Sequence, residues 1–192
     1  MATDEEKDEY FLNNYARIKY LMVLKKYDYK YDEDGDRVTD STGNYVLESI
    51  SDEEAAARKD LATLYYNNIK DGSKTMDEYL EEKYSDIAKT FPNGYYVVQN
   101  IYYSTLFTTT IITAAFDIEP GEVTMTENED AYFIIERLEL EEKAYEGADK
   151  SQFSNLSEYA VGEKFTAKFG EIIDAAYENE NITGEYSVLT VD

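Results

Sequence analysis

The stretch "ITAAFDIEPGEVTMTENEDAYFIIERLE" (residues 112–139) decides the fold, because it joins a helix end, a turn and a strand. The apolar residues at the start of this stretch and just before it lie on one face of a helix. They predict a short helix over residues 105–118, with Phe107, Ile111 and Phe116 facing inward. Pro120 and Gly121 predict a turn. The alternating residues after Ala131 predict a strand that returns to a sheet, so helix and strand lie side by side.

Outward from this stretch, helical and strand patterns are mixed along the chain. The expected elements are a short helix in 1–14, a strand at 16–24, an exposed hairpin insert at about 25–50, a helix at 51–72, a shorter helix at 75–86, a strand from 95 and a final strand at 186–191. Ser51 and Thr75 cap the two middle helices, and Leu64 is expected on the inner face of the first. The sheet is too small to be doubly wound, so the prediction is an α+β fold with a small antiparallel sheet.

The segment after Asp149 predicts a long amphipathic helix that reaches about residue 180. Its apolar stripe includes Phe153, Phe165, Phe169 and Ile173. The first dozen residues are too few to cover that stripe, so we expect either a neighbouring domain or self-association through this helix. The predicted organisation is therefore a helical lead-in (1–14), a main domain (15–142) and a C-terminal helical segment (143–192).

Charge excludes several kinds of partner. The chain has 18 basic and 42 acidic residues, a net charge of −24. Such a surface repels phosphate backbones and anionic lipids, so nucleic acid is not an expected partner. Cationic polypeptides or divalent cations would be attracted at modest ionic strength, although a solvated acidic surface is the simpler interpretation. No apolar run is long enough for direct membrane insertion.

The absence of cysteine and histidine narrows the chemistry further. Without cysteine there are no disulfides, thiol nucleophiles or thiolate metal sites. Without histidine the usual general base near neutral pH and the commonest metal ligand are both missing. No glycine-rich phosphate loop and no Gly-x-Ser-x-Gly motif occurs, so no cofactor is expected.

The hairpin insert contains the acidic turn "DEDGD", which raises the alternative of a calcium site. Asp32, Asp34 and Gly35 do not follow the ligand spacing of an EF-hand loop. We therefore favour turn chemistry over calcium binding at this position.

Several motifs in order resemble one known family. They are "ARIKYLMV", "EEAAARKDLATLYYNNIKDG", "MDEYLEEKYSD", "NGYYV", "ITAAFDIEPGEV" and "AYFIIERLE". Together they resemble the parvulin-type peptidyl-prolyl isomerases, in particular the PrsA and SurA group of extracytoplasmic foldases, over roughly residues 15–140. The most specific piece is "AAFDIEPGEV". The C-terminal segment resembles the part of the PrsA group that joins an N-terminal region in a chaperone domain.

The resemblance implies a pocket floor with two histidines and a cysteine or aspartate. At those positions this chain has Tyr20, Phe133 and Tyr95. All three polar positions are therefore aromatic, and the resemblance implies a degenerate site without confident catalytic residues.

The resemblance also implies an apolar wall, and this chain matches the family more closely at the wall positions than at the polar floor positions. Phe116 falls on the family's phenylalanine, Phe107 and Ile111 lie where methionine and its neighbours stand, and Thr126 or Asn128 replaces a hydroxyl residue. Tyr20, Phe107, Phe116 and Phe133 are on apolar faces of the predicted elements, so each of them also suits an ordinary core.

Three functions stay open on the sequence. The first is a degenerate parvulin-like foldase domain that binds unfolded or proline-containing polypeptide without fast isomerisation. The second keeps a slow isomerase activity through the apolar wall and tyrosine hydroxyls. The third is a non-catalytic structural or assembly module of a surface protein.

The resemblance also implies an extracytoplasmic location. The full-length protein is expected to be secreted or to be a membrane-anchored lipoprotein, with a leader and a further N-terminal region ahead of the sequence given.

Overall fold

The computed structural model describes residues 1–33, 36–84, 89–100 and 107–178. The chain divides into two compact units, which are described separately. The sheet unit is formed by Asn14–Glu142, and the terminal unit by Met1–Asn13 with Lys143–Asp192. The expected final strand at 186–191 lies outside the described residues.

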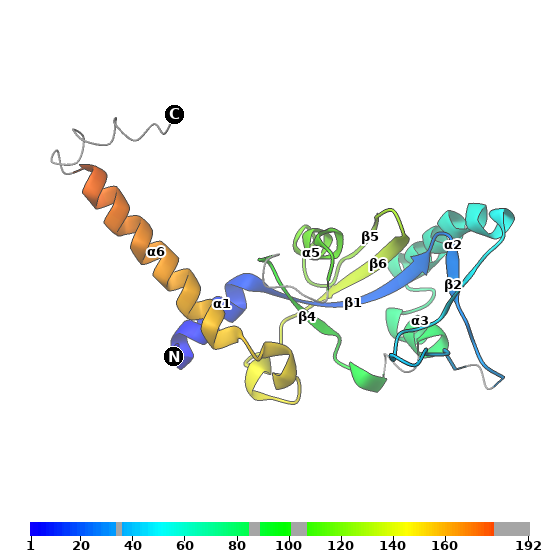
Figure 1. The fold of residues 1–192 in the computed structure, drawn as a ribbon, viewed down its shortest axis with the longest axis horizontal. Helices are drawn as coiled ribbons and strands as arrows, with labels where there is room; N and C mark the ends of the chain where they lie inside the picture. The colour runs from blue at the N-terminus through cyan, green and yellow to red at the C-terminus, as the bar shows by residue number, and fades with distance from the viewer. Residues whose placement is uncertain (34–35, 85–88, 101–106, 179–192) are drawn as a thin grey trace. The chain divides into compact units, whose positions relative to one another are not determined.

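The sheet unit contains a four-stranded antiparallel sheet (Figure 1). Its strands are β1 (Tyr15–Leu24), β4 (Tyr95–Val98), β5 (Val123–Glu127) and β6 (Ala131–Leu138), in the spatial order β4-β1-β6-β5. β1 is central and pairs with β6 along most of its length, from Arg17 opposite Leu138 to Leu24 opposite Ala131. Helices surround this small antiparallel sheet, which confirms the predicted α+β class.

Helices cover the two sheet faces in different ways. Helix α5 (Thr109–Phe116) packs with Ile18, Phe133 and Ile135 on one face, which we call the α5 face. Helices α2 (Asp52–Asp71) and α3 (Met76–Lys83) pack with Leu21 and Ile134 on the other. The side chains of each strand are divided between the two faces of the sheet because successive residues of a strand point in opposite directions.

The helix ends follow their local sequence. Ser51 and Thr75 each form a capping box, in which the hydroxyl oxygen accepts from the N–H three residues later, Glu54 and Glu78 respectively. Gly72 ends α2 in the left-handed conformation, with φ of 77°.

The predictions for α2 and α5 are each wrong in one detail. Leu64 of α2 is exposed, because the helix turns the fully buried Ala62 toward the sheet instead. The helix over 105–118 begins only at Thr109, because Thr108 has an extended backbone, and Phe107 therefore precedes α5.

The hairpin insert leaves the end of β1. Its strands β2 (Tyr27–Tyr29) and β3 (Leu47–Ser49) pair antiparallel, and isolated bridges join Tyr31 to Arg37 and Thr39 to Tyr45. The backbone N–H of Asp36 donates to Asp32 Oδ1 at 2.9 Å, an interaction of the turn itself.

The terminal unit is held together by aromatic side chains. Helix α1 (Asp4–Asn14) contributes Phe11, whose ring lies 5.7 Å from Tyr145 and 5.5 Å from Phe153, both edge to face. Tyr145 belongs to the 3-10 helix η1 (Ala144–Glu146) and Phe153 to η2 (Lys150–Phe153).

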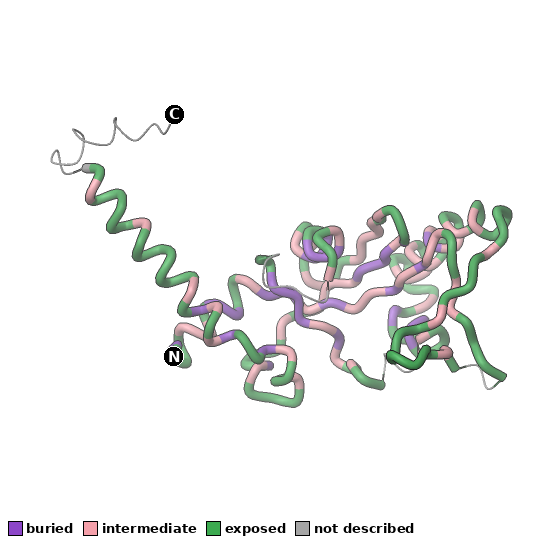
Figure 2. Tube along the Cα trace, viewed as in Figure 1, coloured by how far each residue is buried: buried purple, intermediate pink, exposed green. Residues whose placement is uncertain are grey.

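Helix α6 (Leu156–Glu178) is the long C-terminal helix, and it starts later than predicted because the preceding residues form η2. Figure 2 shows exposed residues along most of its length, whereas buried residues are concentrated on the strands of the sheet. Its exposed apolar side chains are Val161, Phe165, Phe169, Ile172, Ile173 and Tyr177.

Candidate functional site

The predicted site residues come together on the α5 face. Tyr20, on β1, has its ring 5.6 Å from the ring of Tyr95, on β4, and 6.0 Å from the ring of Phe107. Tyr95 and Phe107 lie 5.4 Å apart, so the three rings contact one another pairwise. Phe91 adds a fourth ring, 4.5 Å from Tyr95. We call the cluster of Tyr20, Tyr95 and Phe107 the aromatic floor.

Phe133 and Ile111 lie in the apolar cluster beneath the aromatic floor. Both side chains are buried, and Phe133 stands opposite Thr126 in the pairing of β5 with β6. Thr126 is half-buried and lines a shallow hollow of about 330 Å³ together with side chains from the threonine-rich side of α5. Phe133 and Ile111 therefore act chiefly as core, whereas Thr126 stays near the surface.

Phe116, at the end of α5, packs against the same apolar cluster. The guanidinium of Arg137 lies 5.6 Å from its ring centre and donates a hydrogen bond of 2.6 Å to the carbonyl oxygen of Ile118. This arrangement fixes the chain where it leaves α5 for the Pro-Gly turn.

The turn before β4 sets the position of Tyr95. Gly94 has φ of 87°, and a Cβ on it would lie 2.5 Å from the carbonyl oxygen of Ile18. Only glycine permits both the left-handed backbone and this approach of β4 to β1. The N-G pair noted in the sequence thus has a structural role beside the aromatic floor.

The aromatic floor offers apolar contact and few titratable groups. Burial raises the pKa of the Tyr20 hydroxyl, the neighbouring Tyr29 adds to that effect, and the charge of Arg37 opposes it. Glu136 also has a raised pKa because it is partly buried, but it lies across from Lys19 on the face of α2 and α3. The floor therefore presents a neutral phenol at Tyr20.

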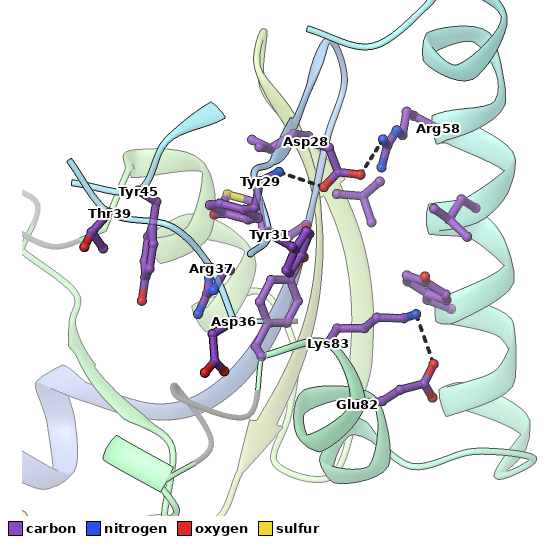
Figure 3. Close-up of a pocket in the computed structure, with 16 residues that line it drawn as sticks. Asp28, Tyr29, Tyr31, Asp36, Arg37, Thr39, Tyr45, Arg58, Glu82 and Lys83 are labelled. Atoms are coloured by element: carbon purple, nitrogen blue, oxygen red, sulfur yellow. Dashed lines mark hydrogen bonds and ion pairs between the residues drawn. The ribbon is translucent and has the colours of Figure 1, made fainter. Parts of the chain in front are cut away.

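A cavity that the sequence did not predict lies at the end of β1. It has a volume of about 800 Å³ and is bounded by β1, the hairpin insert, α2 and α3 (Figure 3). Met22 and Leu24 line it and also pack against the apolar cluster of the α5 face. The cavity thus borders the same apolar cluster on which the aromatic floor rests.

Three tyrosines in this cavity surround one cation. The guanidinium carbon of Arg37 lies 4.1 Å from the ring centre of Tyr45, 4.9 Å from Tyr29 and 5.1 Å from Tyr84. All three distances are within the range of a cation–π interaction. Tyr29 also meets Tyr45 and Tyr84 edge to face, at 5.5 and 6.3 Å. We call Tyr29, Tyr45 and Tyr84 the tyrosine cage.

The cage is anchored to the rest of the sheet unit on two sides. The hydroxyl of Tyr84 donates to the carbonyl oxygen of Met22 at 2.5 Å, which ties the end of α3 to β1. Asp28 accepts a hydrogen bond of 2.8 Å from Arg58, which ties the hairpin to α2 (Figure 3). The hairpin is therefore held to α2 by Asp28, and the end of α3 is held to β1 by Tyr84.

Electrostatics in the cavity favour neutral tyrosines and paired charges. Burial raises the pKa values of Tyr84 and Tyr29, and the positive charge of Arg37 opposes the rise in both. Lys83 pairs with Glu82 at 3.0 Å, so the cavity wall carries carboxylates beside its cations. Asp36 adds a further exposed carboxylate to the lining.

No local sequence pattern predicts the tyrosine cage. Alternation of tyrosine with charge at 27–31 indicates a hairpin strand, but Tyr45 and Tyr84 come from other parts of the chain. The nearest sequence signal is an arginine in a strongly acidic, tyrosine-rich insert.

Comparison of the chain with protein-family models, with curated proteins and with solved structures gave no match. In the described ranges, no group of three or more aspartate or glutamate side chains is arranged to hold a metal ion. None of the described helices combines the length and apolar composition of a membrane span.

Proposed function

We propose that the sheet unit is a parvulin-like module that binds unfolded or proline-containing polypeptide and does not catalyse fast isomerisation. It would assist the folding of exported proteins, in an extracytoplasmic protein that is secreted or anchored as a lipoprotein. This proposal rests on the resemblance together with the geometry of the α5 face.

The observation that carries the proposal is the aromatic floor. Tyr20, Tyr95 and Phe107 come from three separate segments, and their rings meet at centroid distances of 5.4–6.0 Å. Rings in such edge-to-face and tilted contacts form an apolar surface on which a proline ring can pack. Apart from the hairpin strands β2 and β3, which are inserted after β1, the element order also fits the resemblance: β1, two helices, β4, α5, and then β5 and β6.

Slow or absent catalysis follows from the same residues. Rotation about an X-Pro bond has a barrier of about 18–20 kcal/mol, and an enzyme must stabilise the twisted imide specifically. Hydrogen-bonding groups placed around the reacting amide supply much of that stabilisation. At the three positions Tyr20, Tyr95 and Phe133, only the two tyrosine hydroxyls could hydrogen-bond to a substrate amide. Phe133 has no polar group, and its side chain is buried.

A second candidate function is assembly through α6. Phe165 and Phe169 are stacked with rings 6.1 Å apart and 10° between planes, and both are exposed. An exposed row of large apolar side chains on one helix is typical of an interaction surface. It favours self-association or a neighbouring domain as the partner of the terminal unit.

NMR exchange spectroscopy on a capped Ala-Ala-Pro-Ala peptide tests the proposal. We expect the peptide to bind, with chemical shift changes in Tyr20 and Tyr95, while its cis/trans exchange rate stays at the uncatalysed value. Tyr20→Ala should weaken binding about five- to tenfold, because it removes ring contacts worth roughly 1 kcal/mol.

Tyr27→Ala is the matched control, since it deletes an exposed tyrosine of the hairpin. Strong acceleration of exchange would favour the isomerase alternative. A complete lack of binding would leave the assembly function.

A further inference from the structure

The tyrosine cage has the composition of a receptor for a positively charged side chain. Aromatic rings arranged around a cation are attracted to it through their negative faces, and several rings act together. Here three rings surround the guanidinium of Arg37 at 4.1–5.1 Å. The cage is thus a formed cation site whose occupant belongs to the same chain.

The position of Arg37 makes it a replaceable occupant. It lies on the hairpin insert, is only half-buried, and stands beside the exposed Asp36. Tyr45, the ring closest to its guanidinium, is 40% exposed, so one side of the cage is open to solvent. A second cation can reach the cage from that side once the Arg37 side chain moves outward.

The field of the whole molecule favours such a ligand. A net charge of −24 raises the local concentration of cations near the surface. The cavity wall itself carries Asp28, Asp36 and Glu82 beside Arg37, Arg58 and Lys83, and Asp28 and Glu82 are paired with Arg58 and Lys83. The attraction for a cationic ligand therefore comes from the net charge of the whole chain and from the faces of the tyrosine rings.

The cavity also adjoins the aromatic floor. Met22 and Leu24 line the cavity and, like Tyr20 of the floor, pack against the apolar cluster of the α5 face. Tyr29 and Arg37 of the cage also lie close enough to Tyr20 to affect the pKa of its hydroxyl. A polypeptide that places a proline on the floor therefore has its neighbouring residues close to the cage.

We propose that the tyrosine cage binds a lysine or arginine side chain of the client polypeptide, near the residue held on the aromatic floor, and that Arg37 occupies the cage until the client displaces it. This inference rests on the proposed polypeptide-binding function. It names the client class as cationic, proline-containing segments, and it makes Arg37 an internal competitor.

The test uses the full chain, two capped peptides and one small probe. The peptides are Ala-Arg-Ala-Pro-Ala and the same sequence with citrulline, which is the neutral isostere of arginine. The small probe is N-acetylarginine amide, which has no proline and so reports on the cage alone. Binding is followed by NMR titration at low ionic strength.

Arg37→Ala should strengthen binding of N-acetylarginine amide and of the arginine peptide at least about fivefold, since one cation–π competitor is removed. The affinity for the citrulline peptide should not change. In the double variant Arg37→Ala/Tyr45→Ala, the affinity for the arginine peptide should return to that of the unsubstituted chain or below. Lys30→Ala is the charge-matched control, because Lys30 is an exposed hairpin cation paired with Glu48 at 3.3 Å.

The outcomes separate the two proposals. If Arg37→Ala gives no gain, or if Lys30→Ala gives the same gain, the cage proposal is wrong, and binding of the citrulline peptide still measures the floor. If Arg37→Ala binds N-acetylarginine amide more tightly but binds neither peptide, the cage is a cation site and the proposed polypeptide-binding function is wrong. If the Arg37→Ala variant does not fold, Arg37→Gln replaces it, because glutamine keeps the stem of the side chain without the charge. The same affinities are then compared with those of the unsubstituted chain and of Lys30→Ala.

Discussion

The aromatic floor and the tyrosine cage use the same residue type for opposite purposes. In the floor, Tyr20 and Tyr95 contact other rings and rest on the buried apolar cluster of the α5 face. In the cage, Tyr29 and Tyr45 turn their faces to a guanidinium and remain near solvent. A tyrosine ring can thus serve as apolar volume or as an acceptor for a cation, and its neighbours decide which.

This difference predicts a large contrast in stability between the regions. Phe133, beneath the floor, is 4% exposed, whereas Tyr45 of the cage is 40% exposed. Phe133→Ala should lower the free energy of unfolding by about 3–5 kcal/mol, because it leaves a cavity in a packed core. Tyr45→Ala should cost about 1 kcal/mol, since its contacts are partly solvated. Urea unfolding followed by circular dichroism measures both.

Equal losses for the two variants would break the comparison. They would mean that the hairpin insert folds as one cooperative structure with the sheet, and that the cage is as much core as the floor. A loss confined to Phe133→Ala would support the cage as a surface feature on a stable sheet.

A second contrast concerns the two turns that border the α5 face. Gly94→Ala should cost about 2–4 kcal/mol, because a Cβ would meet the backbone oxygen of Ile18 at 2.5 Å in addition to the left-handed strain. Gly121 has nearly the same φ, 86°, but its Cβ would meet nothing within 4 Å. Gly121→Ala should therefore cost only about 1–2 kcal/mol.

The same unfolding measurement compares the two glycine variants. Because they share the strain of positive φ, the difference between them isolates the close approach of β4 to β1. Similar losses would show that β4 shifts to accept the Cβ, and Tyr95 would then be loosely held in the aromatic floor.

The regular elements could be predicted from the sequence because their signals are local. The capping boxes at Ser51 and Thr75 and the alternation in β1 each lie within a few residues. Leu64 was misplaced because hydrophobicity alone ranks it above Ala62, while close packing against the sheet favours the smaller side chain.

The candidate sites differ in the same way. The resemblance assigned Tyr20 and Tyr95 to a pocket floor and Phe107 to an apolar wall of the same site, and the three rings lie together in the structure. Phe133, the third predicted floor residue, lies in the buried core instead. The tyrosine cage joins Tyr29, Tyr45 and Tyr84 across 55 residues of chain, and no helical or strand period links them. Such a site depends on how the hairpin insert packs against α3, which a single sequence does not specify.

The smallest expected effect concerns the hydroxyl of Tyr84. Tyr84→Phe removes the hydrogen bond to the carbonyl oxygen of Met22 and should lower the free energy of unfolding by about 1 kcal/mol at pH 7. Burial raises the pKa of Tyr84, so the folded state keeps its proton at a pH where the unfolded chain, with an ordinary pKa of about 10, has lost it. Stability therefore falls as pH rises above about 10.

Tyr84→Phe removes this proton difference, so its stability should fall less steeply above pH 10 than that of the unsubstituted chain. The gap of about 1 kcal/mol at pH 7 should then narrow or reverse by pH 11, because each pH unit is worth up to about 1.4 kcal/mol per proton. Tyr20→Phe provides the matched variant in the aromatic floor, where burial also raises the pKa. A gap for Tyr84→Phe that stays constant from pH 7 to pH 11 would show that this hydroxyl titrates normally, and hence that the cage is more open to water than its packing against β1 indicates.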